Sequence, residues 1–307
     1  METMAMYHNP VLLRESVDGL DIKKDGVYVD VTFGGGGHSQ EIVKRLGSEG
    51  RLLAFDQDED ALENAIDDER FTLINENFRF VTQFLKFYGI RKVDGILADF
   101  GVSSHQFDTA ERGFSTRFEA NLDMRMSKRS VLSAFEVVNK YDYEELRRVL
   151  FQYGDLRNAN AMAKVVLAER EQSPIKTTER LKEVLQQFLP KGREHKVLAQ
   201  IYQAIRIEVN QEIAVIKEFL LQMPDLLDEG GRLSIISYHS LEDRLVKRFI
   251  RAGRFEGEPE KDFYGNIDVP FKKVGGLIVP SKQEIAQNNR ARSAKLRIAE
   301  RIEKKNN

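Results

Sequence analysis

The stretch YVDVTFGGGGH, from Tyr28 to His38, decides the fold of this chain. Its first half alternates apolar and polar residues and is rich in β-branched and aromatic side chains, which predicts a short strand. The glycines Gly34 to Gly37 follow at once, and glycine lets a backbone turn sharply and touch a ligand. Residues 39–46 then have helical spacing. This order predicts a Rossmann-like unit that binds a nucleotide-type cofactor, with an ordinary tight turn as the alternative.

Asp56 favours the cofactor interpretation. It ends the next apolar run, RLLAFD at residues 51–56, about twenty residues after the glycines. An acidic side chain at that position accepts hydrogen bonds from ribose hydroxyls. The alternative is a cap for the following helix, which Asp58 could provide alone.

The glycine spacing bears on the kind of cofactor. A dinucleotide loop follows G-x-G-x-x-G, because the pyrophosphate rests on the helix N-terminus. Counted from Gly34, the third glycine position holds Ser39, and counted from Gly35 it holds Gln40. The spacing weakens the case for a nicotinamide dinucleotide. S-adenosylmethionine has no phosphate and needs only close backbone approach, so the pattern D-x-T-x-G-x-G at residues 30–36 suits it better.

Composition bounds the function classes. Hydrophobic residues make up 41% of the 307 residues and charged residues 31%, which is ordinary for a soluble protein with one large domain or two smaller ones. No apolar run approaches the roughly eighteen residues of a membrane span, and no signal peptide is evident. The absence of cysteine fits a reducing, cytoplasmic location. The five histidines, none paired at i, i+4, predict no metal site.

Basic residues gather in two places, although the net charge is only −2. Arg244, Lys247, Arg248 and Arg251 fall on one face of a predicted amphipathic helix over residues 241–250 and its end. The segment 281–307 adds Arg292 and seven further basic residues, among them Lys304 and Lys305, against three acidic ones. Such patches indicate contacts with phosphate, and a solvated helix face is the alternative.

Further strands are predicted at 71–77, 93–100, 232–238, 269–279 and 294–299. The run VDGILADF at 93–100 is nearly all apolar, as a central parallel strand should be, yet it contains Asp99 at its end. A buried carboxylate is costly unless it is hydrogen-bonded or faces a ligand, so Asp99 is placed in the active cleft, with helix capping as the alternative. Phe78 follows the third strand. It would lie against an adenine ring or, as spacing alone favours, in the core.

The strand–helix alternation stops between about residues 106 and 213, where only helical patterns occur. We therefore predict a discontinuous domain, residues 1–107 with 213–307, and an inserted helical domain at 108–212. Residues 198–216 carry one apolar stripe, flanked by a polar row that includes Arg206 and Asn210. These two side chains either face the cleft or belong to a solvated helix edge.

Together, these stretches resemble the bacterial ribosomal RNA small-subunit methyltransferase H family, also called MraW. The resemblance runs from HNPVLL at His8, itself read as structural, to LRIAER at 296–301. Its most specific stretches are TFGGGGHS (32–39), DFGVSS (99–104), ERGFS (111–115), LDMRM (122–126), QAIRIEVNQE (203–212), GGRLSIISYHSLEDRLVKRF (230–249) and NRARSAKLR (289–297). The family implies an α/β fold, a Rossmann-like class I methyltransferase with a mostly parallel sheet and an inserted all-helical domain for substrate recognition.

The resemblance also implies a reaction and a site. The reaction is transfer of a methyl group from S-adenosylmethionine to N4 of a cytidine in the decoding centre of 16S ribosomal RNA, within the small subunit. The implied cofactor contacts are Gly36, Gly37, His38, Asp56, Phe78, Asp99 and Gln106. The chain departs from the family at His105, at residues 119–121 and at Asn289, where prolines or a D-G-P turn are common; these departures concern loop conformation.

The chemistry names further candidates. The amine of cytosine is a poor nucleophile, so a group must orient it and another must take its proton. Asp99 is the candidate for orienting the amine or the cofactor, and His239 for the proton, with a structural role as its alternative. The cytosine must be unstacked, and Phe114 is a candidate stacking partner. Two rival functions remain: an RNA-binding ribosome-assembly factor without catalysis, and a nicotinamide-dependent oxidoreductase.

Overall fold

The computed structural model describes residues 10–257 and 269–303, so His8, Lys304 and Lys305 lie outside the described residues. The chain divides into two compact units. The first consists of Met1–Gly101 and Ala214–Asn307, and the second of Val102–Ile213. The second unit therefore begins at residue 102, whereas the sequence analysis places that boundary at 108.

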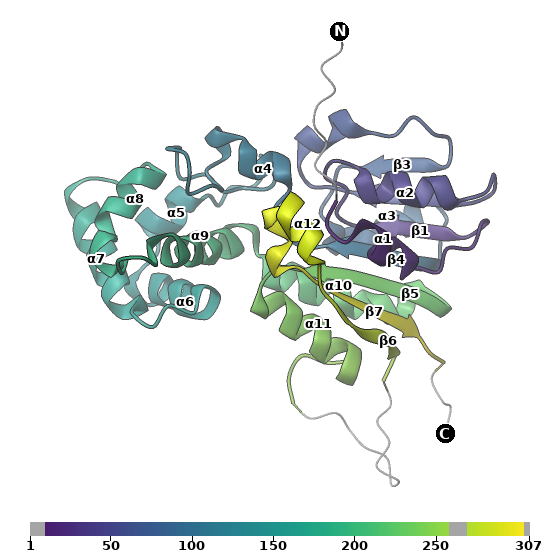
Figure 1. Ribbon diagram of the computed structural model, residues 1–307. Helices are drawn as coiled ribbons and strands as arrows, with labels where there is room; N and C mark the ends of the chain where they lie inside the picture. Colours follow the sequence, from purple (N-terminus) through teal and green to yellow (C-terminus); the bar gives the residue numbers. More distant parts are fainter. Residues whose placement is uncertain (1–9, 258–268, 304–307) are drawn as a thin grey trace. The chain divides into compact units, whose positions relative to one another are not determined.

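The first unit is built on a seven-stranded sheet with the order β3-β2-β1-β4-β5-β7-β6 (Figure 1). Its strands are β1 Val27–Asp30, β2 Arg51–Phe55, β3 Phe71–Ile74, β4 Val93–Asp99, β5 Leu227–Ser237, β6 Phe271–Ile278 and β7 Lys295–Arg301. Strands β1 to β5 pair in parallel, while β7 runs antiparallel to both β5 and β6. The Rossmann-like, mostly parallel α/β sheet predicted from the sequence is confirmed.

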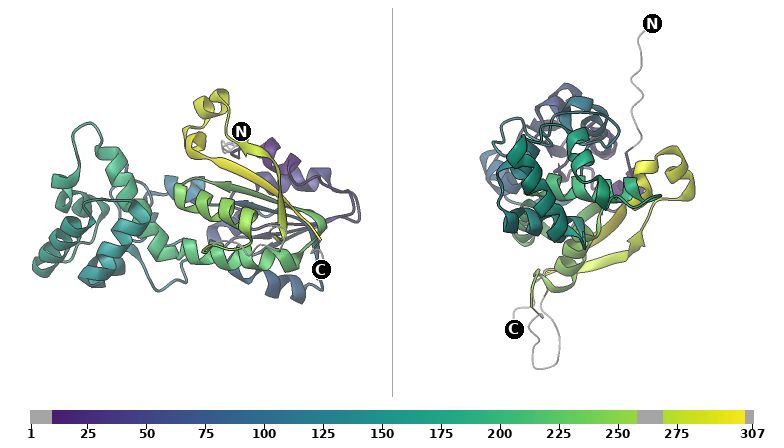
Figure 2. Two further views of the ribbon diagram at one scale, coloured as in Figure 1. Left: turned by 90° about the horizontal axis from the view of Figure 1, so that it is seen from below. Right: turned by 90° about the vertical axis from the view of Figure 1, so that its left-hand side faces the viewer.

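Each face of this sheet has its own hydrophobic core, because successive side chains of a strand point to opposite faces. The covering helices are α1 Leu13–Asp18, α2 Gly37–Arg45, α3 Val81–Phe87, α10 Glu212–Leu226 and α11 Ser240–Ala252. Tyr28 of β1 packs with residues of α1 and α2, whereas its neighbour Val29 packs with residues of α3, α10 and α11. Figure 2 shows the sheet and its helices from two further directions.

Short elements complete the first unit. They are the 3-10 helices η1 Glu59–Asn64, η2 Phe78–Phe80 and η5 Asn289–Ser293, and the helix α12 Lys282–Gln287. Asp58 caps η1 by accepting a hydrogen bond from the backbone N–H of Asp60. Asp56 is therefore not needed as the cap of the segment that follows β2.

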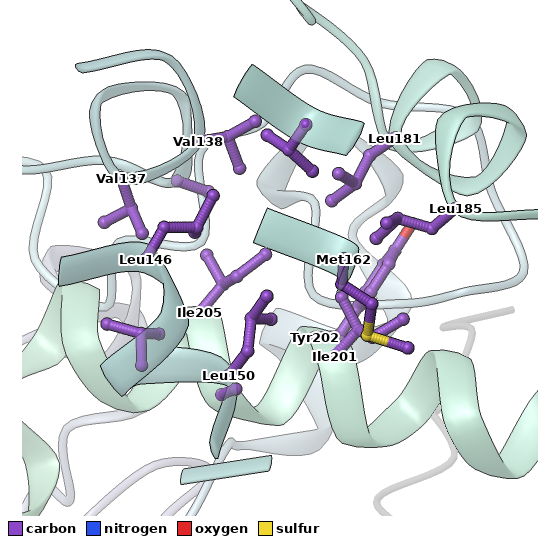
Figure 3. Packing of buried hydrophobic residues seen from close by; sticks show 14 of the residues in the cluster. Val137, Val138, Leu146, Leu150, Met162, Leu181, Leu185, Ile201, Tyr202 and Ile205 are labelled. Carbon is purple, nitrogen blue, oxygen red and sulfur yellow. The ribbon is translucent and has the colours of Figure 1, made fainter. Parts of the chain in front are cut away.

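The second unit contains helices and no ladder strand among residues 102–213. Its helices are α4 Ser104–Asp108, η3 Ala110–Arg112, α5 Ala134–Lys140, α6 Tyr143–Gly154, α7 Ala159–Gln172, α8 Thr178–Val184, η4 Gln186–Phe188 and α9 Glu194–Asn210. They share one hydrophobic core, in which Leu146 and Leu150 of α6 approach Met162 of α7 and Ile205 of α9 (Figure 3).

The apolar stripe at residues 198–216 does not belong to one helix. Helix α9 ends at Asn210, and Gln211 takes a left-handed backbone conformation with φ 51° before α10 begins at Glu212. The apolar period continues across this break, so the hydrophobic pattern alone could not show it. No helix within residues 10–257 and 269–303 has the length and apolar character that crossing a bilayer requires.

Candidate cofactor site at the carboxyl edge of the sheet

The glycine loop between β1 and α2 is held in place by Asp56. One carboxylate oxygen of Asp56 accepts a hydrogen bond from the backbone N–H of Gly34 at 2.8 Å, and the other accepts one from Asp58 at 2.9 Å. The side-chain amide of Asn64 donates to the Gly34 carbonyl at 3.2 Å. The first glycine is thus fixed on both sides before any ligand binds.

Two positions of this loop require glycine. Gly36 has φ 78°, and a Cβ there would lie 2.9 Å from the ring of Phe33. A Cβ on Gly37 would lie 2.1 Å from Cγ of Pro10. Pro10 lies in the stretch HNPVLL, and no sequence pattern connects it with the glycines. The one indication that Pro10 matters is that HNPVLL is among the stretches shared with the family.

Two carboxylates meet where the strand order reverses. Chain order runs from β1 outward to β3 on one side and from β4 onward on the other, and ligands of open α/β sheets bind at such a point. Asp30 ends β1 and is fully buried; its carboxylate accepts hydrogen bonds from Ser39 Oγ at 2.7 Å and from the Thr32 N–H at 3.1 Å. Asp99 ends the neighbouring β4, and its N–H donates to Thr32 Oγ1 at 2.6 Å. The sequence pattern predicts Asp99 as a site residue, whereas it assigns no role to Asp30.

Burial raises the pKa of Asp99 to about 6, against the opposing effects of His38 and of a hydrogen bond from Tyr238. Burial likewise raises the pKa of Asp56 to about 6. Within the described residues, Oδ1 of Asp99 is buried and has no hydrogen-bond partner. A buried, unpartnered carboxylate oxygen costs stability unless a ligand satisfies it, so this atom fits a binding role.

His38 lies at the start of α2 and is only 5% exposed. Its Nε2 is 3.1 Å from the carbonyl oxygen of Val11, and its Nδ1 is 4.0 Å from Oδ2 of Asp99. The imidazole therefore joins the N-terminal segment to the carboxyl edge of the sheet.

Phe78 packs against the core. Its ring centroid lies 5.9 Å from that of Phe100 and 5.3 Å from that of Phe219, and the side chain is partly buried. This packing agrees with the core alternative, and the partial exposure leaves an edge available to a ligand.

His239 has a structural position. It is the N-cap of α11, where its side chain and Glu242 form a capping box, and its Nε2 lies 2.9 Å from Oε1 of the buried Glu242. Gln106 belongs to the second unit, where it is buried and closes a capping box with Ser103 at the start of α4.

Three residues of the second unit that are predicted to contact RNA also take part in its own fold. Phe114 is only 4% exposed and lies in the helical core, so its ring is not available to stack on a base in this structure. Arg206 donates two hydrogen bonds to Glu212, at 2.8 and 2.9 Å. Asn210 accepts from the N–H of Met126 at 2.7 Å and donates to the carbonyl of Met124 at 2.8 Å. Apolar burial and internal hydrogen bonds engage all three side chains, and their contacts with RNA stay predictions.

The second unit also exposes an aromatic residue that the sequence analysis does not single out. Phe118 is 41% exposed, and the guanidinium carbon of Arg117 lies 5.4 Å from its ring centroid. Its carbonyl accepts a hydrogen bond from Thr178 Oγ1 at 3.2 Å, which fixes the segment to the start of α8. The sequence feature that could have indicated Phe118 is its position as the second phenylalanine of the irregular stretch 114–126.

Some of the basic residues of the first unit are exposed, and others pair within the fold. Arg244, Lys247 and Arg292 are exposed, whereas Arg248 donates to the Gly257 carbonyl at 2.6 Å. Lys295 and Arg297 of β7 both pair with Asp243 of α11, at 3.3 and 2.7 Å. The acid in the first turn of α11 thus neutralises part of the basic tail.

Comparison with known proteins identifies the family. Residues 5–302 match the model of the MraW methylase family. The chain belongs to this family. It is 68% identical to the "Ribosomal RNA small subunit methyltransferase H" of Christiangramia forsetii over 98% of this chain and 100% of the relative. It is also 68% identical to the protein of the same name from Flavobacterium johnsoniae, with the same coverage. A solved rRNA methylase from Streptococcus thermophilus aligns over 97% of this chain and 100% of its own at 13% identity, with a TM-score of 0.44.

The family resemblance drawn from the motifs is therefore confirmed, and the chain is an S-adenosylmethionine-dependent methyltransferase. The nicotinamide-dependent oxidoreductase is excluded by this membership. The roles of the individual site residues stay predictions.

Proposed function

We propose that this methyltransferase transfers a methyl group from S-adenosylmethionine to N4 of a cytidine in the decoding centre of 16S ribosomal RNA, within the small subunit. The proposed substrate is supported by the 68% identity, over nearly the whole chain, to relatives named for the small-subunit ribosomal RNA. Because this substrate is ribosomal RNA, the proposal places the enzyme in the cytoplasm. In this proposal the first unit holds the methyl donor and the second unit recognises the RNA.

The residues at the carboxyl edge of the sheet fit the methyl donor. The loop at Gly36 and Gly37 lets the backbone approach it closely, and Asp56 would accept hydrogen bonds from its ribose. The exposed edge of Phe78 would lie against the adenine, and His38 and Asp99 would line the same edge. Gln106 is assigned by the family resemblance alone. The bound donor supplies an electrophilic methyl group on a sulfonium centre.

Asp99 would orient the target amine. The nitrogen lone pair of cytosine is delocalised into the ring, and a carboxylate that accepts a hydrogen bond from the amine favours a geometry in which the lone pair can react. Oδ1 of Asp99 is buried and unpartnered among the described residues, so it can accept such a bond without breaking another. His239 is not assigned this task, because it caps α11.

The RNA contacts are proposed on two surfaces. On the first unit, Arg244, Lys247 and Arg292 are exposed and would contact phosphates, with Arg248 beside them. On the second unit, Phe118 replaces Phe114 as the stacking candidate, since unpaired bases stack on exposed aromatic rings.

The test is methyl transfer from labelled S-adenosylmethionine to 30S subunits and to free 16S RNA, followed by nucleoside analysis. The proposal expects label in N4-methylated cytidine at one position of the RNA. Binding of RNA without transfer would favour a non-catalytic assembly factor, and label in a different nucleoside would replace the proposed substrate atom.

A further inference from the structure

The two ring nitrogens of His38 have different environments. Nε2 lies 3.1 Å from the carbonyl oxygen of Val11, and a carbonyl oxygen can only accept a hydrogen bond. Nε2 must therefore carry the hydrogen. In the neutral imidazole the lone pair is then on Nδ1, the nitrogen that is 4.0 Å from Oδ2 of Asp99. The Val11 carbonyl thus fixes the tautomer in which the basic nitrogen faces the carboxylate.

Carboxylates act electrostatically on both members of this pair. Asp30 is fully buried near His38 and interacts with it electrostatically. The charged or titratable groups that act on Asp99 are His38, Tyr238, Asp30 and Glu242. Only His38 among these gains a positive charge on taking a proton.

The two side chains of the pair differ in their exposure to solvent. The side chain of His38 is 6% exposed and that of Asp99 is 20% exposed. Asp99 is therefore the more accessible side chain of the two, and His38 is almost wholly sheltered. A proton taken up at Asp99 would thus have a second, more sheltered acceptor.

We propose that Asp99 and His38 form a proton-accepting dyad for methyl transfer, in which His38 Nδ1 receives the proton that Asp99 takes from the target amine. This rests on the proposed function, because only transfer to an amine nitrogen releases such a proton. In this proposal His38 does not contact the substrate. It acts through Asp99, from which it receives the proton.

The step balances in protons and electrons. The bond between the amine nitrogen and the methyl carbon forms as the carbon–sulfur bond breaks, and the electron pair of that bond stays on sulfur. The nitrogen loses one proton to Asp99. Asp99 passes it to Nδ1 of His38 when the two groups close from 4.0 Å to hydrogen-bond distance, or through one water. The imidazolium donates from Nε2 to the Val11 carbonyl and lies near the carboxylates of Asp30 and Asp99, until the proton returns to water through Asp99.

The competing explanation is that His38 only supports the glycine loop through Val11. The variant His38→Gln separates the two, because the amide nitrogen of Gln lies near the position of Nε2 and keeps a donor for Val11, while no basic nitrogen remains. The matched control is His195→Gln, which changes an exposed histidine at the start of α9.

Single-turnover methyl transfer at saturating S-adenosylmethionine and 30S subunits is the main measurement. We expect His38→Gln to be slower by about 100-fold, the usual range for a lost acid–base group, and His195→Gln to match the wild type. The pH–rate profile should also change, because the group that receives the proton from Asp99 is absent. Added imidazole should restore part of the rate of His38→Ala.

Two readouts do not depend on turnover. Calorimetry of S-adenosylmethionine binding by His38→Gln measures any loss of cofactor affinity separately, so that the rates are compared at cofactor concentrations that saturate each variant. NMR of the ¹⁵N-labelled histidines in the free protein should show the neutral ring of His38 protonated at Nε2. A rate and pH profile unchanged in His38→Gln, or a ring protonated at Nδ1, would overturn the dyad. Failure of the wild type to methylate the RNA would instead overturn the proposed function.

Discussion

The carboxyl edge of the sheet and the polar row of α9 contain similar polar side chains and use them differently. At the sheet edge, Oδ1 of Asp99 is buried without a hydrogen-bond partner among the described residues. On α9, the amide of Asn210 bonds to the backbone of Met124 and Met126, and Arg206 bonds twice to Glu212. An unsatisfied buried group indicates a place for a ligand, whereas a satisfied one indicates a part of the fold. This contrast leads to predictions of different kinds for the two regions.

The largest expected effect is on the pH dependence of stability at Asp99. Its pKa is about 6 in the folded state, above the value near 3.9 of an unfolded chain, so the folded state binds the extra proton between these values. Folding is therefore destabilised as pH rises from 4 to 6. We expect Asp99→Asn to match the wild type at pH 4 and to be more stable by up to about 3 kcal/mol at pH 8.

Urea unfolding of the ligand-free protein at the two pH values measures this difference. A stability gain that is equal at pH 4 and pH 8 would contradict a raised pKa. A loss of stability at pH 8 would mean that the carboxylate is satisfied in the fold, as Asn210 is.

The opposite sign is expected at Asn210. Asn210→Ala removes two bonds that hold the segment around Met124, a buried residue with a left-handed backbone at φ 56°. The freed N–H of Met126 would lose its partner, and we expect a loss of about 2 kcal/mol in the free energy of unfolding at every pH. Urea unfolding followed by circular dichroism checks it, and an unchanged midpoint would show that Asn210 is free to serve a ligand.

The sequence predicted the sheet well and the helical unit less well, for physical reasons. A buried parallel strand must be almost wholly apolar, so the run at 93–100 could be recognised as a strand from its composition. Asp99 at the end of that run indicated the site. In the helical unit, a polar side chain beside an apolar stripe can face solvent, a ligand or a partner within the fold, and the sequence does not distinguish these cases. Partners such as Glu212 for Arg206, or the loop carbonyl for Asn210, are set by tertiary packing that helical spacing does not encode. The burial of Phe114 and the exposure of Phe118 are hidden for the same reason.

Phe118 offers a way to restore an RNA-binding role to the second unit. Stacking of one base on an aromatic ring contributes about 1–3 kcal/mol, so Phe118→Ala should weaken RNA binding by about that amount. Phe151→Ala is the matched control, since Phe151 is 57% exposed on α6 and has no arginine stacked on it in the described structure. The chain contains no tryptophan, so Phe118→Trp also gives a single fluorophore that a stacked base should quench. Equal affinities for the two alanine variants would remove Phe118 from the RNA surface.

The smallest effect is expected on the basic face of α11. Arg244→Glu with Lys247→Glu should lower RNA affinity by roughly tenfold at low salt and reduce the salt slope by about 0.7–0.9 for each lost phosphate contact. The control is the equal charge reversal Lys44→Glu with Arg51→Glu, two exposed residues of which Arg51 begins β2. Cofactor affinity should stay unchanged in both. Identical slopes for the two pairs would show that this face is merely solvated.

The most direct test of the central claim is single-turnover methyl transfer by Asp99→Asn, compared with the wild type at saturating S-adenosylmethionine and 30S subunits. If the Asp99 carboxylate, whose Oδ1 has no partner among the described residues, serves the reaction, the variant is folded, as stable as the wild type or more so at pH 8, and slower by at least about 100-fold. A rate within threefold of the wild type would contradict the claim that the unsatisfied carboxylate serves the reaction.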